Sequence, residues 1–141
     1  MLEFVLFLGA QEKEILALVY KAGFKVEENT PYCLLGKKFK GFVKKKKKTL
    51  VICTENIKEV TGYNIARFSE DDEDFRTKVT MKKALRHEAT HVAQYCNGSK
   101  LTGFIKNRDR IHKWYKVNAL AGSTAISNIE PEREYEAYLM E

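Results

Sequence analysis

Apolar side chains recur at helical intervals in three segments of the chain, residues 11–21, 77–97 and 129–141. In the second segment they form a single stripe, which comprises Met81, Leu85, Ala89, Val92 and Cys96. Gly98 then provides a helix stop, because glycine adopts the left-handed conformation after a helix without penalty. The pattern predicts an N-terminal helix, a long central helix and a C-terminal helix with Pro131 in its first turn.

Residues that favour strands are concentrated between the first two predicted helices. Residues 24–28 alternate between apolar and polar, and residues 32–35, 38–43 and 49–56 are β-forming segments separated by glycine and lysine. Residues 55–64 fit neither periodicity. These segments predict an α+β fold in which a small antiparallel sheet packs on the central helix, flanked by the N-terminal and C-terminal helices.

Length and composition predict one globular domain over residues 1–141. The chain is 44% hydrophobic and 31% charged, which is typical of a folded protein rather than a disordered one. Residues 1–10 are apolar but carry Glu3, lack a basic start and are too short to span a bilayer. We therefore expect them to pack in the core and not to act as a signal peptide.

The three cysteines are an odd number and form no C-x-x-C pair. This pattern predicts neither a disulfide framework nor a cysteine zinc site, so we expect Cys33, Cys53 and Cys96 to be small buried apolar groups. A reducing cytoplasm fits that interpretation.

The net charge of +6 comes from one segment, residues 37–48, which holds eight lysines and no acid. The remainder of the chain is slightly acidic, so the basic character is local. The five consecutive lysines at 44–48 are predicted in a connection or on a wet strand edge, where charge blocks edge-to-edge aggregation. Phe39 and Phe42 lie among the lysines, and this mixture favours a nucleic acid or an acidic partner as the ligand of the segment.

The predicted central helix contains the motif H-E-x-x-H, formed by His87, Glu88 and His91. Residues four apart on a helix lie one above the other, so both imidazoles can face one metal ion. Zinc with an open coordination position lowers the pKa of its water to about 7. Glu88 is then placed to act as the general base toward that water.

A catalytic zinc usually takes a third protein ligand, and the predicted C-terminal helix is the expected source. Glu136 is the first candidate, because the small Ala137 beside it would let the two helices approach closely. Glu132 and His112 are alternatives that the spacing leaves open. Gln94 lies one turn beyond His91 and is either a hydrogen-bond partner of the site or a solvent-facing residue. Four residues are candidates to stabilise an oxyanion: Tyr95, Tyr115, Tyr135 and His112.

The motif with a downstream glutamate directly before an alanine resembles the gluzincin class of zinc metallopeptidases, of which this chain would be a minimal single-domain member. The resemblance implies that Zn2+ is held by His87, His91 and Glu136, and that Glu88 is the general base for peptide-bond hydrolysis. The N-E-x-x-S-D signature of that class does not occur in the chain.

The resemblance also implies a strand edge above the motif helix that holds an extended peptide, and residues 49–56 are the expected strand. The expected partner is thus a peptide or protein substrate, with no membrane partner. The alternative function is a nucleic-acid-binding module with a structural or catalytically silent zinc site. The oligomeric state is left open by the sequence.

Overall fold

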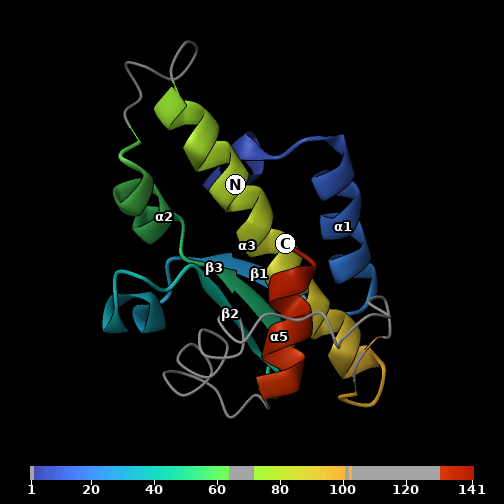
Figure 1. Ribbon diagram of the computed structural model, residues 1–141. Helices are drawn as coiled ribbons and strands as arrows, with labels where there is room; N and C mark the ends of the chain where they lie inside the picture. Colours follow the sequence, from blue (N-terminus) through green and yellow to red (C-terminus); the bar gives the residue numbers. More distant parts are fainter. Residues whose placement is uncertain (1, 64–71, 101, 103–130) are drawn as a thin grey trace.

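One long helix, α3 (Asp72–Cys96), packs against the sheet and against helices on several sides (Figure 1). The computed structural model describes residues 2–63, 72–100, 102 and 131–141. The elements before α3 are η1 (Glu3–Phe7), α1 (Ala10–Lys21), β1 (Lys25–Glu28), η2 (Pro31–Leu35), β2 (Gly41–Lys44), β3 (Thr49–Ile52) and α2 (Thr54–Thr61). The last is α5 (Pro131–Leu139). The α+β class is confirmed.

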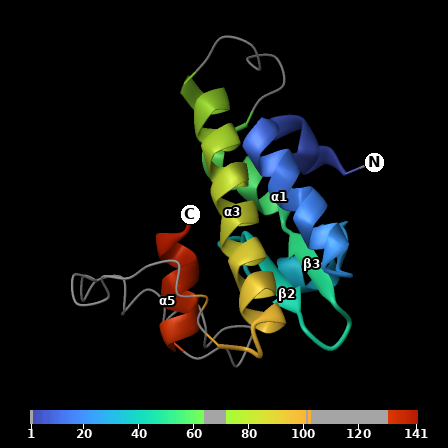
Figure 2. The same cartoon turned by 90° about the vertical axis from the view of Figure 1, so that its right-hand side faces the viewer.

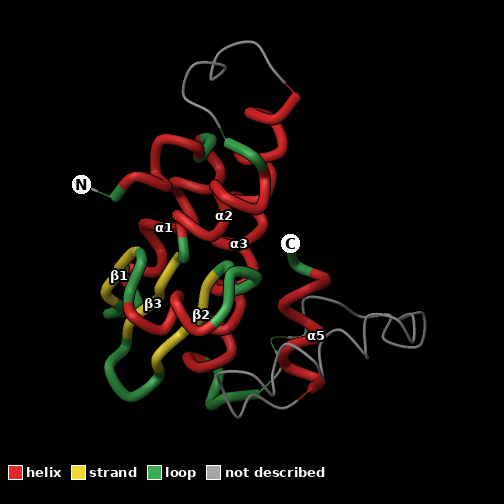
Figure 3. The backbone as a smooth tube through the Cα atoms, turned by 90° about the vertical axis from the view of Figure 1, so that its left-hand side faces the viewer, coloured by secondary structure: helices red, strands yellow, loops and turns green. Residues whose placement is uncertain are grey.

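The sheet is mixed, whereas an antiparallel sheet was predicted. Its strand order is β1-β3-β2, with β1 parallel to β3 and β2 antiparallel to β3 (Figure 3). The chain leaves β1, passes through η2 and β2, and returns as β3 in the same direction as β1. The parallel pair thus follows from this crossover, which strand propensity does not reveal.

The central position of β3 corrects a second prediction. Both edges of β3 are hydrogen-bonded, to β1 and to β2, so residues 49–56 cannot receive a further strand. In addition, the predicted strand ends at Ile52, and the chain continues as α2 from Thr54. The edge strand near α3 is instead β2, which contacts this helix.

The strand predicted at residues 32–35 is wrong, because this segment forms the 3-10 helix η2. Pro31 occupies its first turn, where the missing N–H costs nothing. The Asn56 side-chain amide then donates hydrogen bonds to the carbonyls of Cys33, Gly36 and Phe39 at 2.8, 3.1 and 3.0 Å. These backbone groups are therefore satisfied by a side chain from α2 and not by a neighbouring strand.

The main core lies between α3, η1, α1 and the sheet. Phe4 and Phe7 of η1 are buried there, together with Leu50 of β3 and with Met81 and Leu85 of α3. The prediction that the first ten residues contribute to the core is confirmed. Figure 2 shows α3 between α1 and α5, so one side of the helix meets the core and another faces α5.

The cysteine prediction is confirmed for the burial of Cys33 and Cys53 and wrong in expecting no disulfide and a buried Cys96. Cys33 and Cys53 form a disulfide with Cα atoms 5.6 Å apart, and Cys96 is exposed rather than buried. The partners are twenty positions apart in sequence, and the turn at η2 brings them together. The expectation of a reducing cytoplasm was based on unpaired cysteines, so this pair removes its support and the compartment stays a prediction. In the described ranges, no helix combines the length and apolar character needed to cross a membrane.

Candidate metal centre

The three motif residues lie on the part of α3 that faces α5 and β2. His87, Glu88 and His91 are all buried, and one ligand atom from each lies within 4.8 Å of the others. The two imidazole centroids are 5.0 Å apart, as expected for rings on successive turns of one helix. The helix alone therefore gathers two nitrogen donors and one carboxylate in a space of ionic size.

A second carboxylate reaches the two histidines from α5. Oε1 of Glu134 lies 2.5 Å from Nε2 of His87, and its Oε2 lies 3.4 Å from Nε2 of His91. α5 packs against α3 (Figures 1 and 2), and one carboxylate thereby faces both imidazoles. Glu134 thus occupies the place where the sequence analysis expected Glu136.

Glu136 is buried but is directed to other partners. Its Oε1 accepts hydrogen bonds from Nε2 of Gln94 at 3.0 Å and from the backbone N–H of Thr102 at 2.9 Å. The structure therefore gives no support to Glu136 as the ligand that meets both histidines. The other two candidates, the side chain of Glu132 and the whole of His112, lie outside the described residues.

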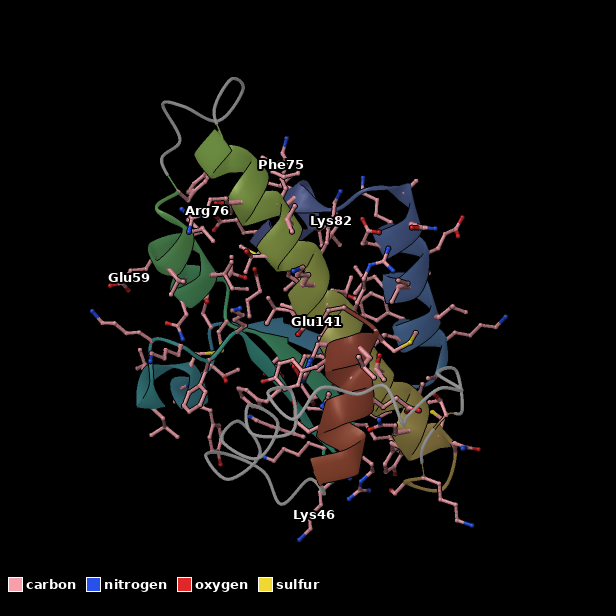
Figure 4. The ribbon with its side chains drawn as sticks, in the orientation of Figure 1. Lys46, Glu59, Phe75, Arg76, Lys82 and Glu141 are labelled. Atoms are coloured by element: carbon pink, nitrogen blue, oxygen red, sulfur yellow. A yellow bond between two sulfur atoms is a disulfide. The ribbon has the colours of Figure 1, made fainter. Side chains whose placement is uncertain are left out.

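A second layer of hydrogen bonds holds the far nitrogen of each ring. Nδ1 of His87 lies 3.0 Å from Oε1 of Glu141, at the end of α5 (Figure 4). Nδ1 of His91 lies 2.9 Å from Oε1 of Gln94. Both imidazoles thus turn Nε2 toward Glu134, which is the arrangement that outer carboxylates and amides impose on metal-binding histidines. Of these partners, Gln94 was a candidate from sequence, whereas Glu141 was missed.

The amide of Gln94 also selects the tautomer of His91. Its nitrogen donates to the carbonyl of Arg133 at 2.9 Å and to Glu136, so its oxygen accepts the proton of Nδ1 from His91. Nε2 of His91 is then the nitrogen with a free lone pair in the neutral ring. That Nε2 atom is buried and has no hydrogen-bond partner among the described residues.

The ionisable groups of the site strongly perturb one another. Burial alone would lower the pKa of His87, but the charge of Glu88 and hydrogen bonds to Glu134 and Glu141 raise it to about 10. Burial would raise the pKa of Glu134, yet its hydrogen bond to His87 and the nearby imidazole of His91 lower it to about 2. The acids around the imidazoles therefore favour a positive charge between α3 and α5, where His87 lies.

Two other groups have their pKa values raised. Burial is the main cause for Glu88, and the nearby imidazoles oppose it. Burial, together with the charge of Glu134, raises the pKa of Tyr138 to about 12, and its ring packs edge-on against His87 at 4.5 Å between centroids. Tyr138 is thus an uncharged residue that lines the site, and the motif did not identify it.

Glu88 lies against β2 at a position where only glycine fits. A Cβ atom on Gly41 would lie 2.7 Å from the carbonyl oxygen of Val51 and 3.0 Å from Cγ of Glu88. Real Cβ atoms do not make contacts this short, so a side chain here would displace the sheet or the carboxylate. The close approach of β2 and α3 therefore depends on Gly41.

The donor set fits a divalent metal of the zinc type. It offers two imidazole nitrogens and a facing carboxylate, with a further carboxylate, Glu88, alongside. The lone pair of His91 without a hydrogen-bond partner is the specific feature that a cation would satisfy. A cation would also replace the positive charge that a proton on His87 supplies in its absence.

Of the candidates for oxyanion stabilisation, Tyr95 lies among the described residues. The Tyr95 ring packs edge-on against Phe24 in the main core, at 5.5 Å between centroids, and so belongs to the core side of α3. Tyr115, His112 and the side chain of Tyr135 lie outside the described residues. No described tyrosine hydroxyl is thereby assigned to this role.

The lysine run lies in the connection between β2 and β3, as predicted. Lys44 ends β2 and places its Nζ 4.9 Å from the ring centroid of Tyr32 and 5.8 Å from that of Phe42. The run therefore begins at the end of an edge strand and continues through the turn to β3.

Comparison with known proteins gives a family match over almost the whole chain. The family model described as a domain of unknown function (DUF8637) matches residues 4–141, which include the sheet, α3 and α5. A search of curated proteins found no match, and a search of solved structures also found none.

Proposed function

We propose that this chain, which belongs to the DUF8637 family, is a zinc-dependent hydrolase that cleaves peptide bonds. The observation that carries the proposal is the meeting of His87 and His91 with the carboxylate of Glu134, beside the buried carboxylate of Glu88. Glu134 takes the ligand role that the sequence analysis gave to Glu136. Two imidazoles and one carboxylate would hold zinc through three protein ligands, the number that catalytic zinc sites use.

Each residue of the cluster has a separate task in this proposal. Zinc, when bound, acidifies a coordinated water and polarises the substrate carbonyl. Glu88 accepts the proton of the attacking water and returns it to the leaving amine. Burial raises the pKa of Glu88. A raised pKa suits a carboxylate that first takes a proton from water and then gives it to the amine.

The edge strand β2 is the proposed holder of an extended substrate. It pairs with β3 on one edge, and among the described residues no strand pairs with the other. Its first residue, Gly41, lies against Glu88, so a peptide added along this edge would pass close to the general base. This support for peptide substrates replaces the role expected for residues 49–56.

A structural zinc site, as in the alternative nucleic-acid-binding module, is less well supported by the same residues. Structural sites favour four ligands and commonly use cysteine, whereas two of the cysteines are paired with each other and Cys96 is exposed. Moreover, a structural site has no use for Glu88 beside the imidazoles. The geometry thus favours a catalytic zinc site over a structural one.

The proposal is tested by loading the full chain with zinc and measuring hydrolysis of fluorescently labelled casein. We expect Glu88→Gln to retain zinc and to lose at least about a hundredfold in rate, which is the usual contribution of a general base. Glu14→Gln, an exposed change on α1, is the matched control and should keep full activity. Hydrolysis that survives Glu88→Gln would refute the assigned base, and a wild-type protein that binds zinc but cleaves nothing would refute the hydrolase.

A further inference from the structure

Three large apolar side chains lie exposed at one turn of the chain. Leu34 and Leu35 are 86% and 68% exposed, and Tyr32 is 48% exposed, all within η2. We call these three residues the η2 tip. In Figure 1, η2 is the short blue-green coil that stands out beside the sheet, on the side of the molecule away from α1. Exposed leucines that cluster in this way usually mark a contact surface.

The fold holds the η2 tip rigidly in this exposed position. Cys33, which lies between Tyr32 and Leu34, is buried and joined by the disulfide to Cys53 at the start of α2. Asn56 of α2 binds the carbonyls of Cys33 and Gly36 from the inside. The two leucines are therefore presented outward by a cross-linked turn and lose little conformational entropy on binding.

Lysines lie next to the η2 tip, in the chain and at Tyr32. Lys37, Lys38 and Lys40 follow it directly in the chain and are exposed, although Lys37 forms an ion pair with Glu59 at 2.9 Å. Lys44 reaches back to Tyr32, with Nζ 4.9 Å from the ring centroid. Beyond Lys44 the lysine run continues through the turn to β3, and Lys46 points away from the molecule (Figure 4). The exposed leucines thus have lysines beside them, after Leu35 in the chain and at Tyr32 in space.

We propose that the η2 tip and its lysines bind the surface of an anionic phospholipid bilayer. Leu34 and Leu35 enter the boundary between headgroups and acyl chains, while the lysines remain at the level of the phosphates. Electrostatic attraction and apolar insertion are each weak alone and suffice together. This inference departs from the expectation of no membrane partner and does not depend on the metal centre.

The leucines favour a bilayer over nucleic acid as the ligand. Nucleic-acid surfaces that lack base readout combine cationic grooves with aromatic rings, which stack on bases. Leucine cannot stack on a base, and beside hydrated phosphates the two leucines would find no apolar environment to enter. Lysines alone would fit RNA as well as lipid, so the apolar centre decides between the two.

The experiment is vesicle flotation of the full chain with phosphatidylcholine vesicles, with or without roughly 30% phosphatidylserine. We expect binding only to the vesicles with phosphatidylserine, and weaker binding as salt is raised. The double variant Leu34→Ser/Leu35→Ser should reduce the bound fraction about tenfold or more. Leu18→Ser, a change at a leucine on α1 that is 63% exposed, is the matched control and should bind normally.

A second pair of variants tests the charge. Lys37→Gln/Lys38→Gln/Lys40→Gln should also weaken binding about tenfold or more, whereas Lys13→Gln/Lys21→Gln/Lys83→Gln removes three exposed lysines elsewhere and should not. Circular dichroism of each variant verifies the fold. Absence of vesicle binding by the wild type, or an equal bound fraction for wild type and Leu34→Ser/Leu35→Ser, would overturn the proposal. Binding of a short single-stranded RNA without binding of vesicles would overturn it in favour of nucleic acid.

Discussion

The side-chain amide of Gln94 fixes the orientation of one imidazole. It accepts from Nδ1 of His91 and donates to the carbonyl of Arg133 and to Glu136. The two donors therefore determine which way the amide faces, and the amide determines which nitrogen of His91 is available to a cation. Glu136 is thus a partner of Gln94, one step removed from the proposed metal.

Replacing Gln94 should weaken zinc binding without removing a ligand. Gln94→Leu leaves Nδ1 of His91 without an acceptor and allows the ring to turn, so we expect zinc affinity to fall about 10–100-fold. Competition with a chromogenic chelator measures this change. Lys83→Gln, on the exposed side of α3, is the control and should have no effect. Unchanged affinity in folded Gln94→Leu would show that the amide does not orient the ring.

A methyl group at Gly41 should disturb both the sheet and Glu88. Gly41→Ala places its Cβ 2.7 Å from a backbone oxygen that cannot move freely, so we expect a loss of about 1–3 kcal/mol in the free energy of unfolding. Gly36→Ala is the comparison, because its Cβ would meet only the Phe39 ring, which can shift. Urea denaturation of both variants tests this. Equal stability of the two would contradict the close approach at β2.

A buried carboxylate joins α1 to α3. Oε2 of Glu12 lies 2.7 Å from the guanidinium of Arg86, its Oε1 lies 3.6 Å from Nζ of Lys82, and the N–H of Gly9 donates to it. In Figure 4, Lys82 lies between the two helices. Burial would raise the pKa of Glu12, but the hydrogen bond and charge of Arg86 outweigh burial and lower it from 4.5.

The contribution of the Glu12 carboxylate to stability should disappear in acid. Because the folded-state pKa of Glu12 is depressed, its stabilisation is present above pH 4.5 and is lost as the pH falls through the folded value. We expect Glu12→Gln to lower the free energy of unfolding by about 1–2 kcal/mol at neutral pH. Urea unfolding at neutral and acid pH should show the difference from wild type shrinking below pH 4.5. A difference independent of pH would mean that charge is not responsible.

Helices could be predicted from the sequence, because their signal is local. The 3.6-residue period at residues 11–21, 77–97 and 129–141 corresponds to α1, α3 and α5. The turn at residues 32–35 was misjudged, since its structure depends on Asn56 and on Cys53, about twenty positions away. No local pattern contains such contacts.

The acid that faces the histidines is not the one expected, although the helix that carries it was predicted correctly. Ala137 does mark the face of α5 that meets α3, but its neighbour in sequence lies about 100° around the helix. The residues that share its face lie three or four positions away, and these include Glu134 and Glu141. Counting in turns from the small residue, instead of in single positions, would have selected Glu134.

The disulfide connects the parts of the molecule that lie on the sheet side. It joins η2 to the start of α2 over a sequence separation of 20, and it lies next to buried Phe42 and Val51. A cross-link of this length stabilises a fold by about 3 kcal/mol, mainly by restricting the unfolded chain.

Removal of the disulfide should therefore lower stability markedly. We expect Cys33→Ala/Cys53→Ala to lose about 2–4 kcal/mol in the free energy of unfolding by urea denaturation without reductant. Cys96→Ser is the control, since Cys96 is exposed and unpaired. Wild type and the double variant should also become similar when reductant is added. A double variant as stable as wild type would contradict a constraining cross-link.

The whole molecule assembles its candidate site from three distant parts of the chain. β2 provides the strand beside Glu88, α3 provides the two imidazoles, and α5 closes the cluster with Glu134 and Glu141. The motif could identify the α3 part, but only the packing of α5 on α3 determines which acid completes it. The proposed metal site therefore depends on the pairing of α3 with α5.

Elemental analysis of zinc in wild type, Glu134→Gln and Glu136→Gln after dialysis tests this pairing most directly. We predict about one zinc per chain in wild type and in Glu136→Gln, and much less in Glu134→Gln, which has lost the facing carboxylate. No zinc in the wild-type protein, or zinc lost from Glu136→Gln and kept by Glu134→Gln, would contradict the assignment.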